Sequence, residues 1–237
     1  MREEGMGKRG LAFFSGGKDS IFSLWKAKEQ GIPVDLLLFN THDFPRPNIH
    51  EVNFAVVRAI ASLIGIPFYT LHLEDGQEYS KLSNFFSDHN VGWVIAGSIS
   101  SKDQLKWYEG LCDEVGAELY APLWAGERSS SLGTLAEEVA WGVKAVICDL
   151  DPSMLRKELL GRVIDADLVG ELSSSVEPCG ECGEYHTLVL EAPIMSGRIV
   201  LENWIIMKGW NRYMLKVDKF RVEKTSKSRL SGRDLYR

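Results

Sequence analysis

Short apolar runs alternate with amphipathic segments along the first half of the chain. The runs have the length of buried strands and lie at residues 11–14, 34–39, 67–71, 91–96 and 118–120. Between them, apolar positions at helical spacing predict helices that begin near Ile21 and cover residues 52–63 and 104–115. This alternation is typical of an α/β protein with a parallel sheet covered by helices on both faces.

The pattern changes after residue 125. A helix is expected at residues 132–141, a buried strand at 145–150 and another helix around Leu155, Leu159 and Leu160. Strands then dominate, at residues 185–190, 199–207 and 213–222, with a turn at Lys208-Gly209. We therefore expect a first domain at residues 1–125 and a second, smaller α/β domain at 126–237.

Composition narrows the functional classes. The 237 residues are 45% hydrophobic, which suits one large or two small globular domains, and the seven tryptophans are expected in their cores. No apolar run reaches ~18 residues and the start lacks a signal core, so we expect a cytoplasmic protein without a membrane span. Four cysteines are too few for a disulfide framework.

A net charge of −6 argues against broad nucleic-acid binding. The C-terminal end is nevertheless basic, either as a solvated terminus or as a contact for an acidic or RNA-rich partner. Its basic residues are Lys216, Lys219, Arg221, Lys224, Lys227, Arg229, Arg233 and Arg237.

A glycine-rich turn separates the first predicted strand from the first helix. It reads Ser15-Gly16-Gly17-Lys18-Asp19-Ser20. Glycines let the backbone approach a phosphate, while a helix N-terminus and a lysine favour negative charge. Asn40 and the pair Gly97-Ser98 also follow predicted strands, so all three segments are expected to converge on one crevice at the carboxyl ends of a parallel sheet.

The hexapeptide is not the GxxxxGK[ST] phosphate loop, because its glycines are adjacent and its lysine precedes an aspartate. It resembles instead the pyrophosphate loop (PP-loop) of the N-type ATP pyrophosphatases. This resemblance implies a HUP/Rossmann-like nucleotide-binding domain and cleavage of ATP to AMP and pyrophosphate.

Residues 177–193 hold the densest polar chemistry outside that loop. From the residues alone, Gly180-Glu181 and Gly183-Glu184 fit either a ligand-binding loop or a glycine turn with solvated carboxylates. The pattern Gly-Glu-x-Gly-Glu-aromatic-x-Thr, followed by a strand and a proline, resembles the diphthine–ammonia ligase family.

Other blocks match that family in the same order, from about residue 11 to 200. They are Asn48-Ile49-His50, Gly65-Ile66-Pro67, Gly97 to Ser101 with Gln104, Pro122-Leu123-Trp124 and residues 160–165. The chain departs from the family at Leu105 and Lys106, where arginines are typical, and at Cys182 and His186. These departures leave the identity of the acceptor open.

The resemblance implies an ATP-dependent ligase that forms diphthamide on elongation factor 2 from diphthine and ammonia. The implied catalytic residues are Lys18, Asp19, Glu181 and Glu184. The implied nucleotide-binding residues are Ser15, Gly16, Gly17, Lys18, Asp19, Ser20, Asn40, His50, Gly97 and Ser98. The implied substrate-binding residues are Gln104, Gly180, Gly183, Tyr185 and His186. Asp19 either reaches Mg²⁺ or caps the helix.

Three alternatives stay open from sequence. The pair Cys179 and Cys182 supplies only two of the four ligands of a structural zinc, so ordinary loop cysteines are favoured. An RNA-modifying ligase would use the same adenylation with a basic face, and a nucleotide sensor would bind ATP without turnover. Association with a second copy of the chain is not decided.

Overall fold

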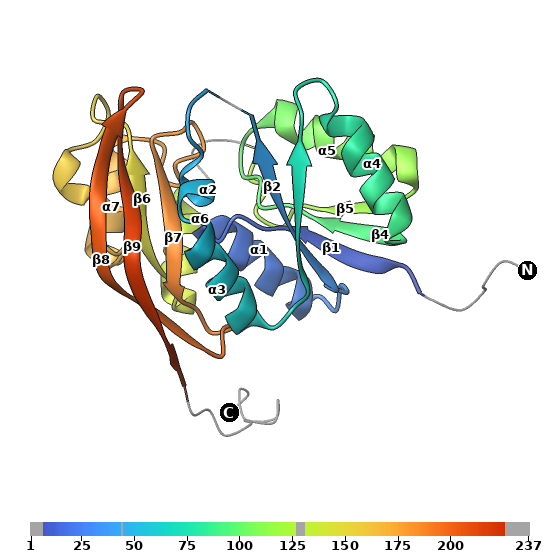
Figure 1. Cartoon of the computed structure of the whole chain (residues 1–237), viewed down its shortest axis with the longest axis horizontal. Coiled ribbons are helices and arrows are strands. Elements are labelled where there is room, and N and C mark those ends of the chain that lie inside the picture. The colour runs from blue at the N-terminus through green and yellow to red at the C-terminus, as the bar shows by residue number, and fades with distance from the viewer. Residues whose placement is uncertain (1–6, 44, 127–130, 226–237) are drawn as a thin grey trace, which may run out of the picture.

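The computed structural model describes residues 7–43, 45–126 and 131–225 of the chain. Its first sheet has five parallel strands in the order β3-β2-β1-β4-β5 (Figure 1). The strands are β1 (Arg9–Phe13), β2 (Leu36–His42), β3 (Phe68–Leu73), β4 (Val91–Ile95) and β5 (Glu118–Tyr120). Leu11 and Ala12 are fully buried, as expected for a central strand covered on both faces.

Helices cover both faces of this sheet, which confirms the predicted fold class. They are α1 (Lys18–Glu29), α2 (Ile49–Val52), α3 (Phe54–Ile64), α4 (Glu78–Asp88) and α5 (Lys102–Val115). Helices α4 and α5 close one face around Leu82, Phe86 and Leu111, and α1 and α3 pack on the other face through Ile21 and Ile60. Helix α4 was not expected from the sequence, because its apolar stripe is narrow and most of its positions are polar.

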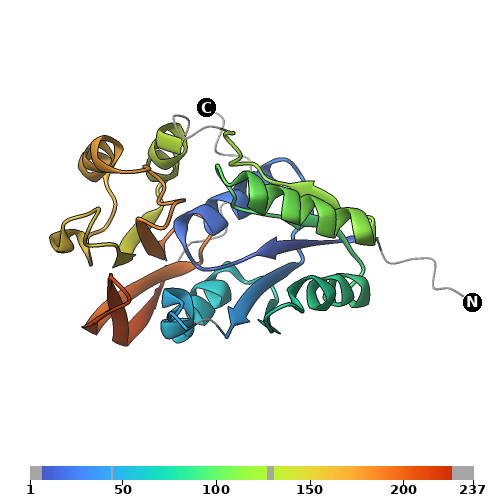
Figure 2. The ribbon, with the colours of Figure 1, turned by 90° about the horizontal axis from the view of Figure 1, so that it is seen from above.

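The second sheet is antiparallel, with the order β7-β6-β9-β8. Its strands are β6 (Lys144–Leu150), β7 (Tyr185–Glu191), β8 (Gly197–Gly209) and β9 (Arg212–Lys224). Helices α6 (Ser131–Trp141) and α7 (Ala166–Ser175) and the short 3₁₀ turn η2 (Lys157–Leu159) complete this smaller α/β unit. Seen from above in Figure 2, the β8–β9 hairpin projects at the side of the molecule away from the parallel sheet.

The helices α1 and α3 lie between the two sheets and share one core with both of them (Figure 1). Val189 N–H donates to Gly16 O at 2.9 Å, so β7 bonds directly to the glycine-rich turn. Asn53, which separates α2 from α3, donates to Leu215 O at 2.9 Å and accepts from Val217 N–H at 2.8 Å. These contacts fix the second sheet against the first loop, while the boundary at residue 125 stays a prediction.

Several local predictions were wrong. Leu155, Leu159 and Leu160 do not form a helix, because they pack into the second core from turns and from η2. Helix α7 was not expected. The hairpin turns at Trp210 and Asn211, not at Lys208-Gly209, since Gly209 still pairs with Arg212.

Two further expectations need correction. Asn40 lies within β2, two residues before its end, and does not follow the strand. Trp107, Trp204 and Trp210 are exposed, so the tryptophans are not all in the core.

The basic stripe of β9 is partly neutralised where the structure describes it. Lys219 Nζ and Arg221 Nε lie 2.9 and 3.1 Å from the carboxylate of Glu202. Lys227, Arg229, Arg233 and Arg237 lie outside the described residues. Among the described helices, none is long and apolar enough to cross a bilayer.

Candidate active site

Strands β1, β2 and β4 end at the same edge of the parallel sheet, beside two adjoining cavities of about 330 and 360 Å³. The strand order changes direction at β1, so this edge is the topological switch point where α/β sheets bind ligands. Six side chains line both cavities, and all six were predicted as catalytic or as ligands of nucleotide or substrate. They are Ser15, Asp19, His50, Gln104, Glu181 and His186.

The glycine-rich turn takes the shape that its glycines allow. Gly16 has a φ of +78°, and Gly17 begins α1 as its N-cap. Ser15 Oγ accepts from Gly17 N–H at 3.2 Å, and Ser20 Oγ donates to Gly17 O at 2.9 Å. Gly97 has to be small, because a Cβ there would lie 3.1 Å from the Asp19 carbonyl group. The loop after β4 therefore approaches the first turn of α1 closely.

Lys18 is buried below the turn and lines neither cavity. Its Nζ lies 2.5 Å from Asp19 Oδ1 and 3.4 Å from Glu138 Oε2, on α6. Burial opposes its charge, but Asp19 and Glu138 outweigh that effect and raise the pKa of Lys18 well above its usual value. Burial and the charge of Asp19 raise the pKa of Glu138. In this arrangement Lys18 holds Asp19 in place and does not face the cavities.

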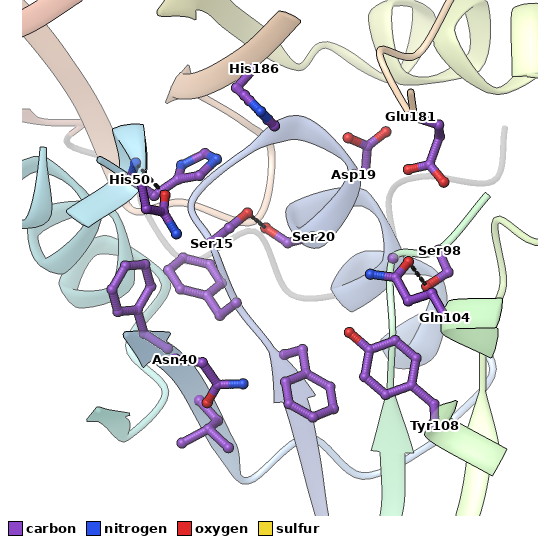
Figure 3. Close-up of a pocket in the computed structure, with 16 residues that line it drawn as sticks. Ser15, Asp19, Ser20, Asn40, His50, Ser98, Gln104, Tyr108, Glu181 and His186 are labelled. Atoms are coloured by element: carbon purple, nitrogen blue, oxygen red, sulfur yellow. Dashed lines mark hydrogen bonds between the residues drawn. The ribbon is translucent and has the colours of Figure 1, made fainter. Parts of the chain in front are cut away.

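Glu181 links the two halves of the site. Its Oε2 accepts from the backbone N–H groups of Ile99 and Ser100 at 3.1 and 3.2 Å, across from the second sheet to the loop after β4. Burial and the neighbouring Asp19 raise the pKa of this carboxyl group. Asp19 and Glu181 face the same space in Figure 3.

Glu184 has a different position from the one expected. It is fully buried, lines neither cavity, and accepts from Glu177 N–H and Cys182 N–H at 3.3 and 2.9 Å. Gly180 is needed for close packing, because it has a φ of +81° and a Cβ would lie 2.7 Å from Tyr185 O. Glu184 and Gly180 therefore shape the loop that presents Glu181. Gly180, Gly183 and Tyr185 line the second cavity.

Two histidines form a wall of the site. The rings of His50 and His186 meet edge to face, with their centroids 5.8 Å apart. Burial, reinforced by His186, lowers the pKa of His50 to about 3. Burial, together with Arg212, lowers the pKa of His186 to about 4. Both imidazoles are therefore neutral at pH 7.

One end of the first cavity suits a flat apolar ring. Asn40 and Tyr108 lie at this end in Figure 3, and Phe13 and Phe14 also line the cavity. Asn40 Oδ1 is buried with no hydrogen-bond partner among the described residues. Nearby, Ser98 Oγ donates to Gln104 Oε1 at 2.8 Å. An aromatic floor with an unused acceptor fits the ring and the amino group of a purine. The other end of the cavity meets the glycine-rich turn.

The donor set fits a magnesium ion that arrives with a nucleotide. The described residues include no cluster of three or more side chains suited to hold a metal by themselves. Asp19 and Glu181 nevertheless offer two carboxylates on one cavity, and Mg²⁺ commonly takes one or two carboxylates together with phosphate oxygens.

The two cysteines of the CxxC segment lie in different environments. Cys179 is buried and its Sγ donates to Ser131 O at 3.1 Å. Burial raises the pKa of the Cys179 thiol, while Cys182 is exposed. Cys179 therefore remains a thiol at neutral pH, which is unlike a reactive thiolate.

Four residues that contribute to the site were not predicted from the sequence. Tyr108 and Arg46 line cavities, Thr187 accepts from Lys18 N–H at 3.1 Å, and Glu138 faces Lys18. Only Glu138 carried a usable signal, since it is a charged position one helical turn from the buried Leu135 on an amphipathic helix.

Comparisons with known proteins agree with this geometry. The chain matches the diphthamide synthase N-terminal domain over residues 8–119 and the diphthamide synthase C-terminal domain over residues 131–223. Relatives named diphthine–ammonia ligase come from Danio rerio (26% identical, covering 82% of this chain and 86% of that protein) and Homo sapiens (24%, covering 82% and 83%).

A third relative of that name, from Schizosaccharomyces pombe, is 26% identical over 81% of this chain. The match covers 36% of that protein, so the chain spans about a third of its length. Since both family domains match and together cover most of the sequence, the chain belongs to the diphthamide synthase family of C–N bond-forming ligases.

Proposed function

We propose that this chain is an ATP-dependent ligase that converts diphthine on elongation factor 2 to diphthamide, with ammonia as the nitrogen donor and AMP and pyrophosphate as products. Family membership supports the type of reaction. The cavity at the switch point supports the use of a nucleotide, because a base-sized apolar end and a glycine-rich turn at a helix N-terminus lie in one space.

In the first step, a carboxylate oxygen of the acceptor attacks the α-phosphorus of ATP. The bond from that phosphorus to the bridging oxygen breaks, and pyrophosphate leaves with the electron pair. Ser15, Gly17 and the first turn of α1 bind the leaving phosphates. Asp19 would hold a Mg²⁺ ion that arrives with the nucleotide, and such an ion would supply positive charge beside the leaving pyrophosphate. Lys18 acts as a positioning residue for Asp19, together with Glu138.

In the second step, the nitrogen of ammonia attacks the acyl carbon of the adenylate. The bond from that carbon to the AMP oxygen breaks, AMP leaves, and the nitrogen loses a proton. Glu181 is placed to accept this proton, since it lines both cavities and its pKa is raised. The buried loop around Glu184 and Tyr185 excludes water from the adenylate in this scheme.

The proposal is supported most directly by the two hydrogen bonds that Ile99 N–H and Ser100 N–H donate to Glu181, because they join the loop after β4 to the loop before β7 beside the cavities. The test measures pyrophosphate and AMP release from ATP, Mg²⁺ and ammonium, with and without diphthine-bearing elongation factor 2. Diphthine is a modified histidine, and mass spectrometry of this residue follows the change from carboxylate to amide.

The variant Glu181→Gln is compared with Glu137→Gln, an exposed position that pairs with Lys26 outside the site. We expect the first to lose turnover and the second to retain it. Pyrophosphate release that is the same with and without elongation factor 2 would contradict this choice of acceptor, and RNA or small acids would be tested next. ATP binding without any release would favour a nucleotide sensor.

A further inference from the structure

The tip of the β8–β9 hairpin holds a tryptophan in an unusual conformation. Trp210 and Asn211 form the two-residue turn, with φ values of 52° and 56°. Such turns favour asparagine and glycine, and a bulky side chain rarely adopts a positive φ. The indole is also 56% exposed. A strained and exposed aromatic residue does not stabilise the fold, and such residues are often found at functional sites.

The residues beside this tryptophan are fixed to the site. Asn211 Nδ2 donates to Asp151 Oδ1 at 3.1 Å. Arg212 is buried, donates from Nε to Asp149 Oδ1 at 2.9 Å, and donates from Nη1 to the carbonyl of Gly183. Gly183 belongs to the loop that presents Glu181. These hydrogen bonds fix the position of the hairpin tip relative to the active-site loop, and they fix the backbone on which Trp210 stands.

Trp210 lines a third cavity, of about 640 Å³, that continues into the site. Its apolar lining includes Pro45, Pro47 and Ile49, and its inner wall is formed by His50 and His186. The same two histidines line both cavities described above. The groove is thus a route from the hairpin tip to the place where the nucleotide is expected.

Arg46 stands at the junction, since it lines both this groove and the second cavity. Its guanidinium suits a carboxylate that passes from the groove toward the α-phosphate. Tryptophan and arginine are also the residues that most often dominate protein–protein binding energy.

We propose that this groove docks the protein acceptor, with the modified imidazole side chain packed on Trp210 and its carboxylate drawn past Arg46 to the nucleotide. The inference rests on the proposed function and names its acceptor subsite. A flat ring stacks on an indole, and the charge of Arg46 complements the reacting group. The nucleotide is expected in the first cavity, and Trp210, Pro45 and Pro47 of this groove line no part of that cavity.

The experiment distinguishes the contribution of the Trp210 side chain from an effect on the folding of the hairpin. Fluorescently labelled elongation factor 2 bearing diphthine is titrated, without ATP, with wild type, Trp210→Gly, Trp210→Phe and Trp204→Ala. Trp204 is the matched control, because it is an exposed tryptophan of the same hairpin that lines no part of the groove. Glycine suits the positive φ, so Trp210→Gly is expected to melt no earlier than wild type.

We expect Trp210→Gly to weaken acceptor affinity roughly tenfold or more, and Trp210→Phe to recover most of it. In turnover assays the KM for the acceptor should rise while the KM for ATP stays the same. Trp204→Ala should match wild type in both assays.

Three results would overturn the inference: equal affinity for wild type and Trp210→Gly, equal losses at both tryptophans, or no acceptor binding by wild type. A dimer of this chain that Trp210→Gly dissociates without changing acceptor affinity would also overturn it. Acceptor binding that depends on Trp210 but leads to no amide would contradict the proposed function and leave the docking surface standing.

Discussion

Thr187 Oγ1 accepts a hydrogen bond from the backbone N–H of Lys18 at 3.1 Å. The bond joins β7 of the antiparallel sheet to the first residue of α1, beneath the glycine-rich turn. Together with the bond from Val189 N–H to Gly16 O, it makes the shape of the expected phosphate site depend on the second sheet.

Thr187→Val should therefore weaken both folding and nucleotide binding. Valine keeps the volume but leaves the Lys18 N–H buried without its acceptor, which costs about 1–3 kcal/mol of unfolding free energy. We expect a higher KM for ATP as well. Thr70→Val, at an exposed position of β3, is the control and should change neither denaturation nor the KM. A Thr187→Val variant with the stability and the KM for ATP of wild type would contradict this dependence on the second sheet.

Lys18→Met tests the buried charge cluster. Removing the ammonium leaves Asp19 and Glu138 without their shared cation, and breaking a buried pair costs about 3–5 kcal/mol. Pyrophosphate release should fall below detection, since Asp19 loses its support. Lys26→Met removes a partly exposed pair with Glu137, where a loss of about 0–1 kcal/mol is expected. Chemical denaturation of both variants measures the difference, and equal losses would contradict the role given to Lys18.

Substitutions of Glu181 and Glu184, in the loop before β7, should differ in their effect on the stability of the fold. Both bonds to Glu181 end on one oxygen, so Glu181→Gln can keep them and should melt near wild type while losing turnover. Glu184 accepts with one bond on each oxygen, so Glu184→Gln loses an acceptor and should be less stable by about 1–3 kcal/mol. Thermal melts and pyrophosphate assays on both variants decide, and the reverse order would contradict the assignment.

Stability should fall as the pH drops below neutrality because of His50. Its pKa is about 3 in the folded chain, below the usual 6.5, so the unfolded chain binds a proton more readily. The contribution is complete above pH 6.5 and is lost between pH 6.5 and about 3. Unfolding free energies of wild type and His50→Asn across this range measure it. The variant should show a flatter profile, and an unchanged profile would rule out His50 as a source.

The local parts of the site could be predicted from the sequence. The strand, glycine turn and helix around Ser15 and Gly17 follow from neighbouring residues. The cavity positions of Asp19 and Glu181 agree instead with roles that the family resemblance implied. The strand–helix order also predicted the parallel sheet and the convergence of its loops.

The remaining features depend on contacts between distant residues. The burial of Lys18 against Glu138 joins helices α1 and α6, and no local pattern reports it. Glu184 looks like Glu181 in the sequence, and only their hydrogen bonds distinguish a loop support from a cavity group. The turn at Trp210 was missed because strand pairing imposes it on a residue with a poor turn preference.

We propose that the switch-point cavity carries out adenylation and amide formation on a protein acceptor. The most direct measurement is pyrophosphate release from ATP, Mg²⁺ and ammonium with diphthine-bearing elongation factor 2, together with the mass of the modified histidine. We expect release that requires the factor, conversion of carboxylate to amide in equal amount, and loss of both at steady state in Glu181→Gln. Release that is unaffected by the factor, or an unchanged mass despite release, would contradict it.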